Sequence, residues 1–259
     1  MAPNRVIAPL SLLSLACAAG AWADDPPAPP PPMGVWIGKG QFGFLDSHGN
    51  SDAESINGNL DLLRYDGDWK NDLYVAGLYG KSAGIVSAER VEAHEQTNYS
   101  FSGNLFVFGG LRYEHDEFDG FQYQASVTTG LGYKVLDLVS DKLTVQVGAG
   151  YSRLRPEIID KDADGAVIDR IPQESQGDAI GTVGVDYSHA FNKTTTLSNK
   201  LLVESGSLNT NINDQIALTV KMSNTLALSV GYGIIDNTKP TPPTKNLDTT
   251  ATVNLVFAF

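Results

Sequence analysis

Four histidines are the residues whose type and spacing could support hydrolytic chemistry. A histidine and a serine two positions apart on one strand project from the same face, so that the histidine can act as base. The histidines are His48, His94, His115 and His189, and the residues two positions after them are Asn50, Gln96, Glu117 and Phe191. Ser188 directly precedes His189, and adjacent strand residues point to opposite faces. The spacing therefore argues against a hydrolase, and we predict no catalytic residue.

A run of alternating aspartates is the pattern that resembles a metal site. It consists of Asp160, Asp162, Asp164 and Gly165. Alternating carboxylates before a glycine match the first half of a calcium-binding loop, but Ile171 stands where the closing glutamate would be. We therefore expect a solvated acidic loop over residues 156–175, and we predict no metal ligand and no cofactor. Weak binding of a divalent cation there, or bridging by such a cation to lipopolysaccharide, is the alternative.

Strands are the elements that must position these side chains. Apolar residues alternate with polar residues or glycine over 121–135, 143–151 and 226–232, which is the period of a strand with one apolar face. At 105–108 both faces are apolar. The expected strands are 35–46, 54–65, 69–81, 90–102, 105–115, 121–136, 142–155, 176–190, 196–205, 211–221, 225–235 and 248–259. About twelve strands of this length suffice to cross a bilayer at a tilt.

The connections between these segments alternate in length. The even-numbered connections are short, at 66–68, 103–104, 138–141, 192–195 and 223–224. The odd-numbered ones are mostly longer, at 47–53, 82–89, 116–120, 156–175, 206–210 and 236–247. In outer-membrane barrels, short turns face the periplasm and long loops face outward. The alternation therefore predicts an all-β fold, an antiparallel up-and-down transmembrane β-barrel.

Aromatic and charged residues fit the two faces of such a barrel. Aromatic girdles are expected from Trp36, Trp69, Tyr133 and Phe259 at the periplasmic side and from Phe44, Tyr113, Phe121, Tyr151 and Tyr232 at the outer side. The polar faces would line the lumen and carry Arg112, Glu114, Lys134, Glu204 and Lys221. These charges could tune the ion selectivity of a pore, or they could pair across the lumen and close it.

The two ends of the sequence resemble export signals. Residues 1–23 fit a signal peptide, with Arg5 before an apolar core and a small-residue cleavage site at Ala21-Trp22-Ala23. A lipoprotein signal at Cys17 fits less well, because Ser14 stands where such signals carry leucine. Residues 24–33 form a proline-rich linker. The last nine residues alternate in polarity and end on Phe259, which resembles the C-terminal strand signal of outer-membrane barrels.

Two stretches of the chain resemble a known family. The first hairpin contains Trp36, Gly38, Gly49, Asn50 and Ser51, and the middle of the chain contains Asp116-Glu117-Phe118 and the strand Gly130 to Tyr133. These motifs are similar to those of the YdiY-like salt-induced outer-membrane proteins, a family otherwise described as a domain of unknown function. The resemblance covers nearly all of residues 34–259. It implies an outer-membrane barrel tied to salt or osmotic stress, and it carries over no catalytic residue.

The sequence thus predicts a signal peptide (1–23), a periplasmic linker (24–33) and a barrel (34–259). The expected role is non-enzymatic, either a narrow passive channel or a structural envelope protein. Outer-membrane lipid, lipopolysaccharide and the barrel assembly machinery are the expected partners. Nucleic acid is not, because the net charge is −12. A lipid-modifying hydrolase and a soluble periplasmic β-sandwich are the alternatives.

Overall fold

The computed structural model describes residues 33–47, 53–162, 166–241 and 244–259. Within them the chain forms antiparallel strands. These are β1 (Trp36–Ser47), β2 (Ala53–Asp66), β3 (Trp69–Ser82), β4 (Ile85–Ser100), β5 (Leu105–Asp116), β6 (Phe121–Asp137), β7 (Asp141–Lys161), β8 (Val167–Pro172), β9 (Gln176–Ala190), β10 (Thr195–Gly206), β11 (Thr210–Lys221), β12 (Leu226–Asn237) and β13 (Leu247–Ala258). Among the described residues, no helical segment has the length and hydropathy needed to span a bilayer.

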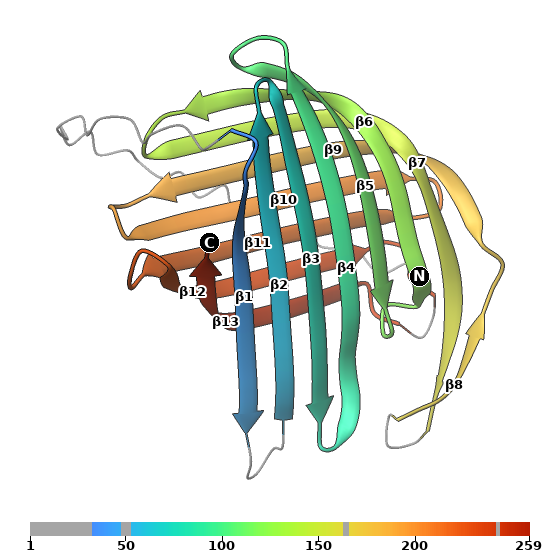
Figure 1. Cartoon of the computed structure of the whole chain (residues 1–259). Helices are drawn as coiled ribbons and strands as arrows, with labels where there is room; N and C mark the ends of the chain where they lie inside the picture. Colours follow the sequence, from blue (N-terminus) through green and yellow to red (C-terminus); the bar gives the residue numbers. More distant parts are fainter. Residues whose placement is uncertain (1–32, 48–52, 163–165, 242–243) are drawn as a thin grey trace, which may run out of the picture.

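Twelve of these strands close into a ring (Figure 1). Consecutive strands pair as antiparallel neighbours, β9 pairs with β7, and β1 pairs with β13 to close the sheet. The strand β8 pairs with β7 and projects with it beyond the ring. The predicted up-and-down barrel is confirmed, and the β-sandwich alternative is wrong, because a closed ring leaves no second sheet to pack against.

The structure corrects three of the expected boundaries. The predicted loop 82–89 is a tight turn at Ala83 and Gly84, both at positive φ, because β3 and β4 extend as a hairpin beyond the apolar part of the barrel. The predicted loop 156–175 contains a second hairpin, formed by the end of β7 and by β8. Met33, the last residue of the predicted linker, forms a bridge with Tyr65.

The outer face of the ring is apolar. Leu111, Val127, Val147, Val230 and Val253 each expose more than half of their surface. The predicted girdle aromatics are exposed with them, with the exception of Phe121, which is 3% exposed. The register between β5 and β6 shifts beside Phe121, and its side chain is consequently buried. An apolar belt around a closed ring satisfies the two requirements for a sheet that lies in lipid.

Two aromatic rings pack inside the ring rather than outside it. Phe106 and Phe108 are buried, and they lie against the glycines of the neighbouring strands β6 and β7. A side chain at Gly132 would meet the ring of Phe106, and one at Gly130 would meet the ring of Phe108. The glycines of the inner face thus make room for two rings that the sequence pattern did not assign to a face.

Candidate functional site

A network of charged side chains crosses the interior of the ring. Arg112 lies on β5, and its guanidinium donates a hydrogen bond of 3.0 Å to the carboxylate of Glu204 on β10. Three strands, β6, β7 and β9, separate these two strands along the wall. The pair therefore joins two parts of the wall that share no backbone hydrogen bond. Glu204 also accepts a hydrogen bond of 2.6 Å from the hydroxyl of Ser126 on β6.

Charges on β4 and β5 complete this network, which we call the lumen bridge (Arg90, Glu92, Arg112, Glu114 and Glu204). Arg112 pairs with Glu114, and Arg90 reaches Glu114 at 2.9 Å and Glu92 at 2.8 Å. Arg112 is 8% exposed and Glu114 is 2% exposed. Buried carboxylates and guanidinium groups are stable only when they are paired. The lumen bridge is therefore a tightly coupled unit rather than a set of independent ion pairs.

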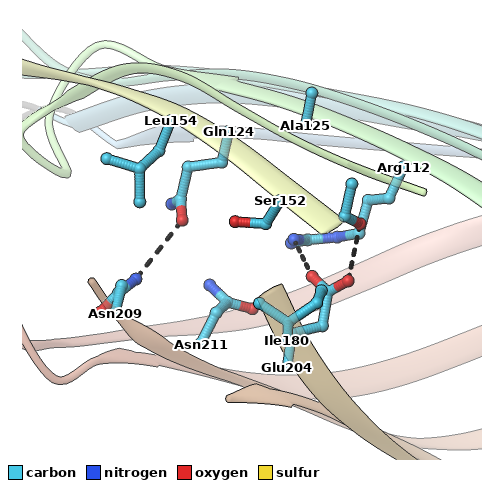
Figure 2. Close-up of a pocket in the computed structure, with 10 residues that line it drawn as sticks. Arg112, Gln124, Ala125, Ser152, Leu154, Ile180, Glu204, Asn209 and Asn211 are labelled. Carbon is cyan, nitrogen blue, oxygen red and sulfur yellow. Dashed lines mark hydrogen bonds and ion pairs between the residues drawn. The ribbon is translucent and has the colours of Figure 1, made fainter. Parts of the chain in front are cut away.

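A small cavity adjoins the lumen bridge (Figure 2). Its volume is about 20 Å³, and Arg112, Ser152, Ile180, Glu204 and Asn211 contribute to its lining. Space of this size holds about one water molecule. Side chains therefore narrow the interior at this level.

A second polar layer lies toward the end of the ring that carries the long loops. Asn209, in the connection from β10 to β11, donates hydrogen bonds to Asn237 at 2.6 Å and to Gln124 at 3.4 Å. Gln124 in turn donates to Asp119 at 3.1 Å. All four side chains are buried. This layer lies beyond the lumen bridge and extends the narrow part of the interior toward the long-loop end.

Asp119 lies in the connection between β5 and β6 and is buried without a cationic partner in the described residues. Burial raises the pKa of its carboxyl well above the usual range, and the nearby Asp116 and Glu114 act in the same direction. Because the pKa is higher in the folded state, the stability from this group is present below the unfolded pKa and is lost as the pH rises toward the folded value.

The variant Asp119→Asn tests this pH dependence. The amide keeps an oxygen that can accept the 2.9 Å hydrogen bond from the backbone nitrogen of Phe121. We expect the variant to be more stable than the wild type at about pH 7 and to lose this advantage near pH 3, where the carboxyl is protonated in both states. Urea unfolding at the two pH values measures the difference. An equal change in the free energy of unfolding at both pH values would contradict the raised pKa of Asp119. The variant Asp169→Asn, on the exposed β7–β8 hairpin, is the control.

Lysine side chains lie at the opposite end of the interior. Cross-strand register places Lys134, Lys200 and Lys221 on the same inner face as Glu204, at the end of the ring with short turns. Lys200 and Lys221 are exposed, and Lys134 is half-buried. Lysine side chains are therefore solvent-accessible at the short-turn end of the interior, whereas the charged side chains of the lumen bridge are buried.

The three histidines that the structure describes do not form a shared site. His48 lies outside the described residues. His94 stacks on Tyr74 inside the ring, with 4.9 Å between the ring centroids. His115 bonds to Glu117 at 2.9 Å, and His189 bonds to Asp141 at 2.8 Å. In the described part of the chain, none of these rings has a hydrogen bond to a serine.

Two residues of the aspartate run, Asp160 and Asp162, lie at the end of β7 and just beyond it. Asp160 belongs to β7, and Asp162 accepts a hydrogen bond of 2.9 Å from the backbone nitrogen of Ala166. Asp164 and Gly165 lie outside the described residues. Within these limits, no group of three or more acidic, histidine or cysteine residues is placed to hold a metal ion. Asp162 thus has a structural role in the turn, and weak cation binding stays a prediction.

All five lumen charges expected from the sequence lie on the inner face. Arg112, Glu114 and Glu204 come together, whereas Lys134 and Lys221 lie apart from them. Arg90 and Glu92 were not among the lumen charges expected from the sequence. The alternation of β4 could have identified both, since they share the inner face with His94.

A closed antiparallel ring with an apolar outer belt and a charged interior defines a membrane-spanning β-barrel of the outer-membrane type. The chain belongs to the family described as protein of unknown function DUF481, whose model matches residues 40–259. The link of this family to salt induction is not part of that description. No curated protein matches the sequence.

Solved structures of outer-membrane proteins are similar in fold. The NanC porin is 10% identical with a TM-score of 0.48, and the match covers 85% of this chain and 98% of the porin chain. The translocator domain of the autotransporter NalP from Neisseria meningitidis is 12% identical with a TM-score of 0.45, covering 86% and 87%. The Pseudomonas putida toluene transporter TodX is 12% identical with a TM-score of 0.36, covering 86% and 88%.

Proposed function

We propose that this protein is a non-enzymatic barrel of the bacterial outer membrane that acts as a narrow passive channel, constricted by the lumen bridge. The observation that carries the proposal is the gradient along the interior, from exposed lysines at one end to the buried Arg112–Glu204 pair at the other. Solvent-accessible charges inside the ring favour a channel over a barrel whose interior is filled along its whole length. Short turns face the periplasm in outer-membrane barrels, so the half with the exposed lysines faces the periplasm.

Single-channel conductance in a planar bilayer tests this proposal. We expect small steady steps from the wild type and larger steps from the double variant Arg112→Ala/Glu204→Ala, because both partners across the lumen are removed together. The exposed pair Arg64 and Asp66 provides the control double variant Arg64→Ala/Asp66→Ala. Silent bilayers from both the wild type and the lumen variant, with a folded barrel confirmed by heat-modifiable gel migration, would instead indicate a structural envelope protein.

Export and assembly belong to the same proposal. Residues 1–23 act as a cleaved signal peptide, residues 24–33 as a periplasmic linker, and the last strand as the signal for the barrel assembly machinery. The pairing of β13 with β1 is consistent with a strand that completes the ring. Outer-membrane lipid and lipopolysaccharide surround the belt. The resemblance to salt-induced proteins supports a role in salt or osmotic stress, which growth of a deletion strain at high salt would test.

A lipid-modifying hydrolase is the weaker functional alternative. In the described residues, His94, His115 and His189 bond or stack with partners other than serine. An assay of the purified barrel with phospholipid and lipopolysaccharide substrates decides between the two. Release of fatty acid by the wild type would overturn the non-enzymatic assignment.

A further inference from the structure

Lysines gather on the inner face of the ring near its short-turn end. Cross-strand register places six of them there, all within the first or last six residues of their strands. They are Lys39, Lys70, Lys134, Lys142, Lys200 and Lys221. They come from six different strands, so they surround the opening rather than line one side of it. This concentration of positive charge contrasts with the net charge of −12 of the whole chain.

Most of these ammonium groups have no carboxylate within ion-pair distance. Lys70 pairs with Asp72 at 3.3 Å, and Lys142 pairs with Asp137 at 3.6 Å in an exposed contact. The other four form no salt bridge within the described part of the chain. Three of these four, Lys39, Lys200 and Lys221, are exposed. The positive charge is therefore available to a ligand that enters from this end.

Acidic groups on the inner face neutralise only part of this charge. Register places Asp61, Asp72 and Asp186 inside the ring, and all three interact electrostatically with Lys200. Register also places Asp137 opposite Lys142, so four carboxylates face six ammonium groups in this half. In the other half the inner face carries Glu92, Glu114 and Glu204 against Arg90 and Arg112. The interior is thus positive at the short-turn end and carries an excess of acid at the long-loop end.

We infer that the short-turn half of the lumen is a binding vestibule for small oxyanions with two or more negative charges, such as phosphate or a polycarboxylate. Ammonium groups from several strands contact such an anion from different sides, and a confined space with few counter-charges strengthens their attraction. The lumen bridge stops the anion from continuing freely into the acidic half. This inference rests on the proposed channel only for its direction of access, from the periplasm.

Equilibrium binding of citrate to the full-length barrel in non-ionic detergent tests the vestibule. Isothermal titration at low salt should give saturable binding to the wild type, weakened by added sodium chloride. The variant Lys134→Gln/Lys200→Gln/Lys221→Gln should bind roughly tenfold more weakly or worse, because three ammonium contacts are lost. The variant with arginine at the same three positions should retain binding, since the charge is kept.

A matched variant controls for general surface charge. Lys81→Gln/Lys239→Gln/Lys245→Gln removes the same number of charges at the long-loop end and should leave citrate binding unchanged. Equal weakening in both triple variants, or no weakening in the lumen variant, would overturn the vestibule. Binding at equilibrium needs no current. A silent bilayer with intact citrate binding would therefore refute only the channel, and conductance without citrate binding would refute only the vestibule.

Discussion

Arg112→Ala is expected to lower the free energy of unfolding by about 3–5 kcal/mol. The guanidinium of Arg112 is the charge that Glu114 and Glu204 share, and a further carboxylate, that of Glu92, lies 3.6 Å from it. Without it, Glu92 and Glu114 retain only Arg90, and Glu204 retains no cation of the lumen bridge. Unfolding in urea, followed by tryptophan fluorescence in lipid vesicles, measures the loss.

The control for this variant is Arg64→Ala on the outside of the ring. Arg64 pairs with Asp66 at 3.5 Å, and both side chains are exposed. Exposed pairs contribute up to about 1 kcal/mol, so the control should unfold nearly like the wild type. If Arg112→Ala lowered the free energy of unfolding no more than the control does, the lumen bridge would not stabilise the contact between β5 and β10.

Gly130→Ala is expected to destabilise the barrel by about 3 kcal/mol or more, at the upper end of the usual cost of overpacking. A methyl group at Gly130 would meet the backbone of Val147 and Gly148 on β7 as well as the ring of Phe108. Backbone in a closed sheet cannot move aside without breaking ladder hydrogen bonds. The yield of folded, heat-modifiable barrel and its urea midpoint measure the effect.

Gly109→Ala provides the matched comparison. Gly109 lies on the adjacent strand β5, and a methyl group there would meet no atom within 4 Å. We expect this variant to fold with the same yield as the wild type. If both alanine variants folded equally well, the close approach of β6 and β7 at Gly130 would not occur in the protein.

The closed ring, and which residues of most strands face outward, could be predicted from the sequence. This is because the alternation of apolar and polar residues along a strand is a local property of the chain. The alternating apolar residues of 143–151 and 226–232 lie on the outer face, as their pattern predicts. Polar extensions were harder to recognise. The first residues of β4 and the whole of β8 lie beyond the apolar belt, where strands need no apolar face, and their alternation is consequently weak.

The contacts inside the ring could not be predicted in the same way. Sequence placed Arg112 and Glu204 on polar faces, but their contact depends on how the cross-section of the ring brings β5 near β10. No local pattern encodes that distance. Phe106 and Phe108 were ambiguous because both faces of their strand are apolar. The burial of Phe121 depends on a register shift, which alternation by itself cannot reveal.

Labelling of single cysteines with a water-soluble maleimide tests the central claim most directly, that the lumen is accessible at the short-turn half and constricted at the lumen bridge to less than the width of the maleimide. In a Cys17→Ser background, cysteine replaces the exposed Lys200, the buried Asn211 or the lipid-facing Val230. With the barrel in lipid vesicles, we expect rapid labelling for Lys200→Cys and none for Val230→Cys. Asn211→Cys should label only when Arg112→Ala/Glu204→Ala is added. Equal labelling of Lys200→Cys and Asn211→Cys with the lumen bridge intact would contradict the account.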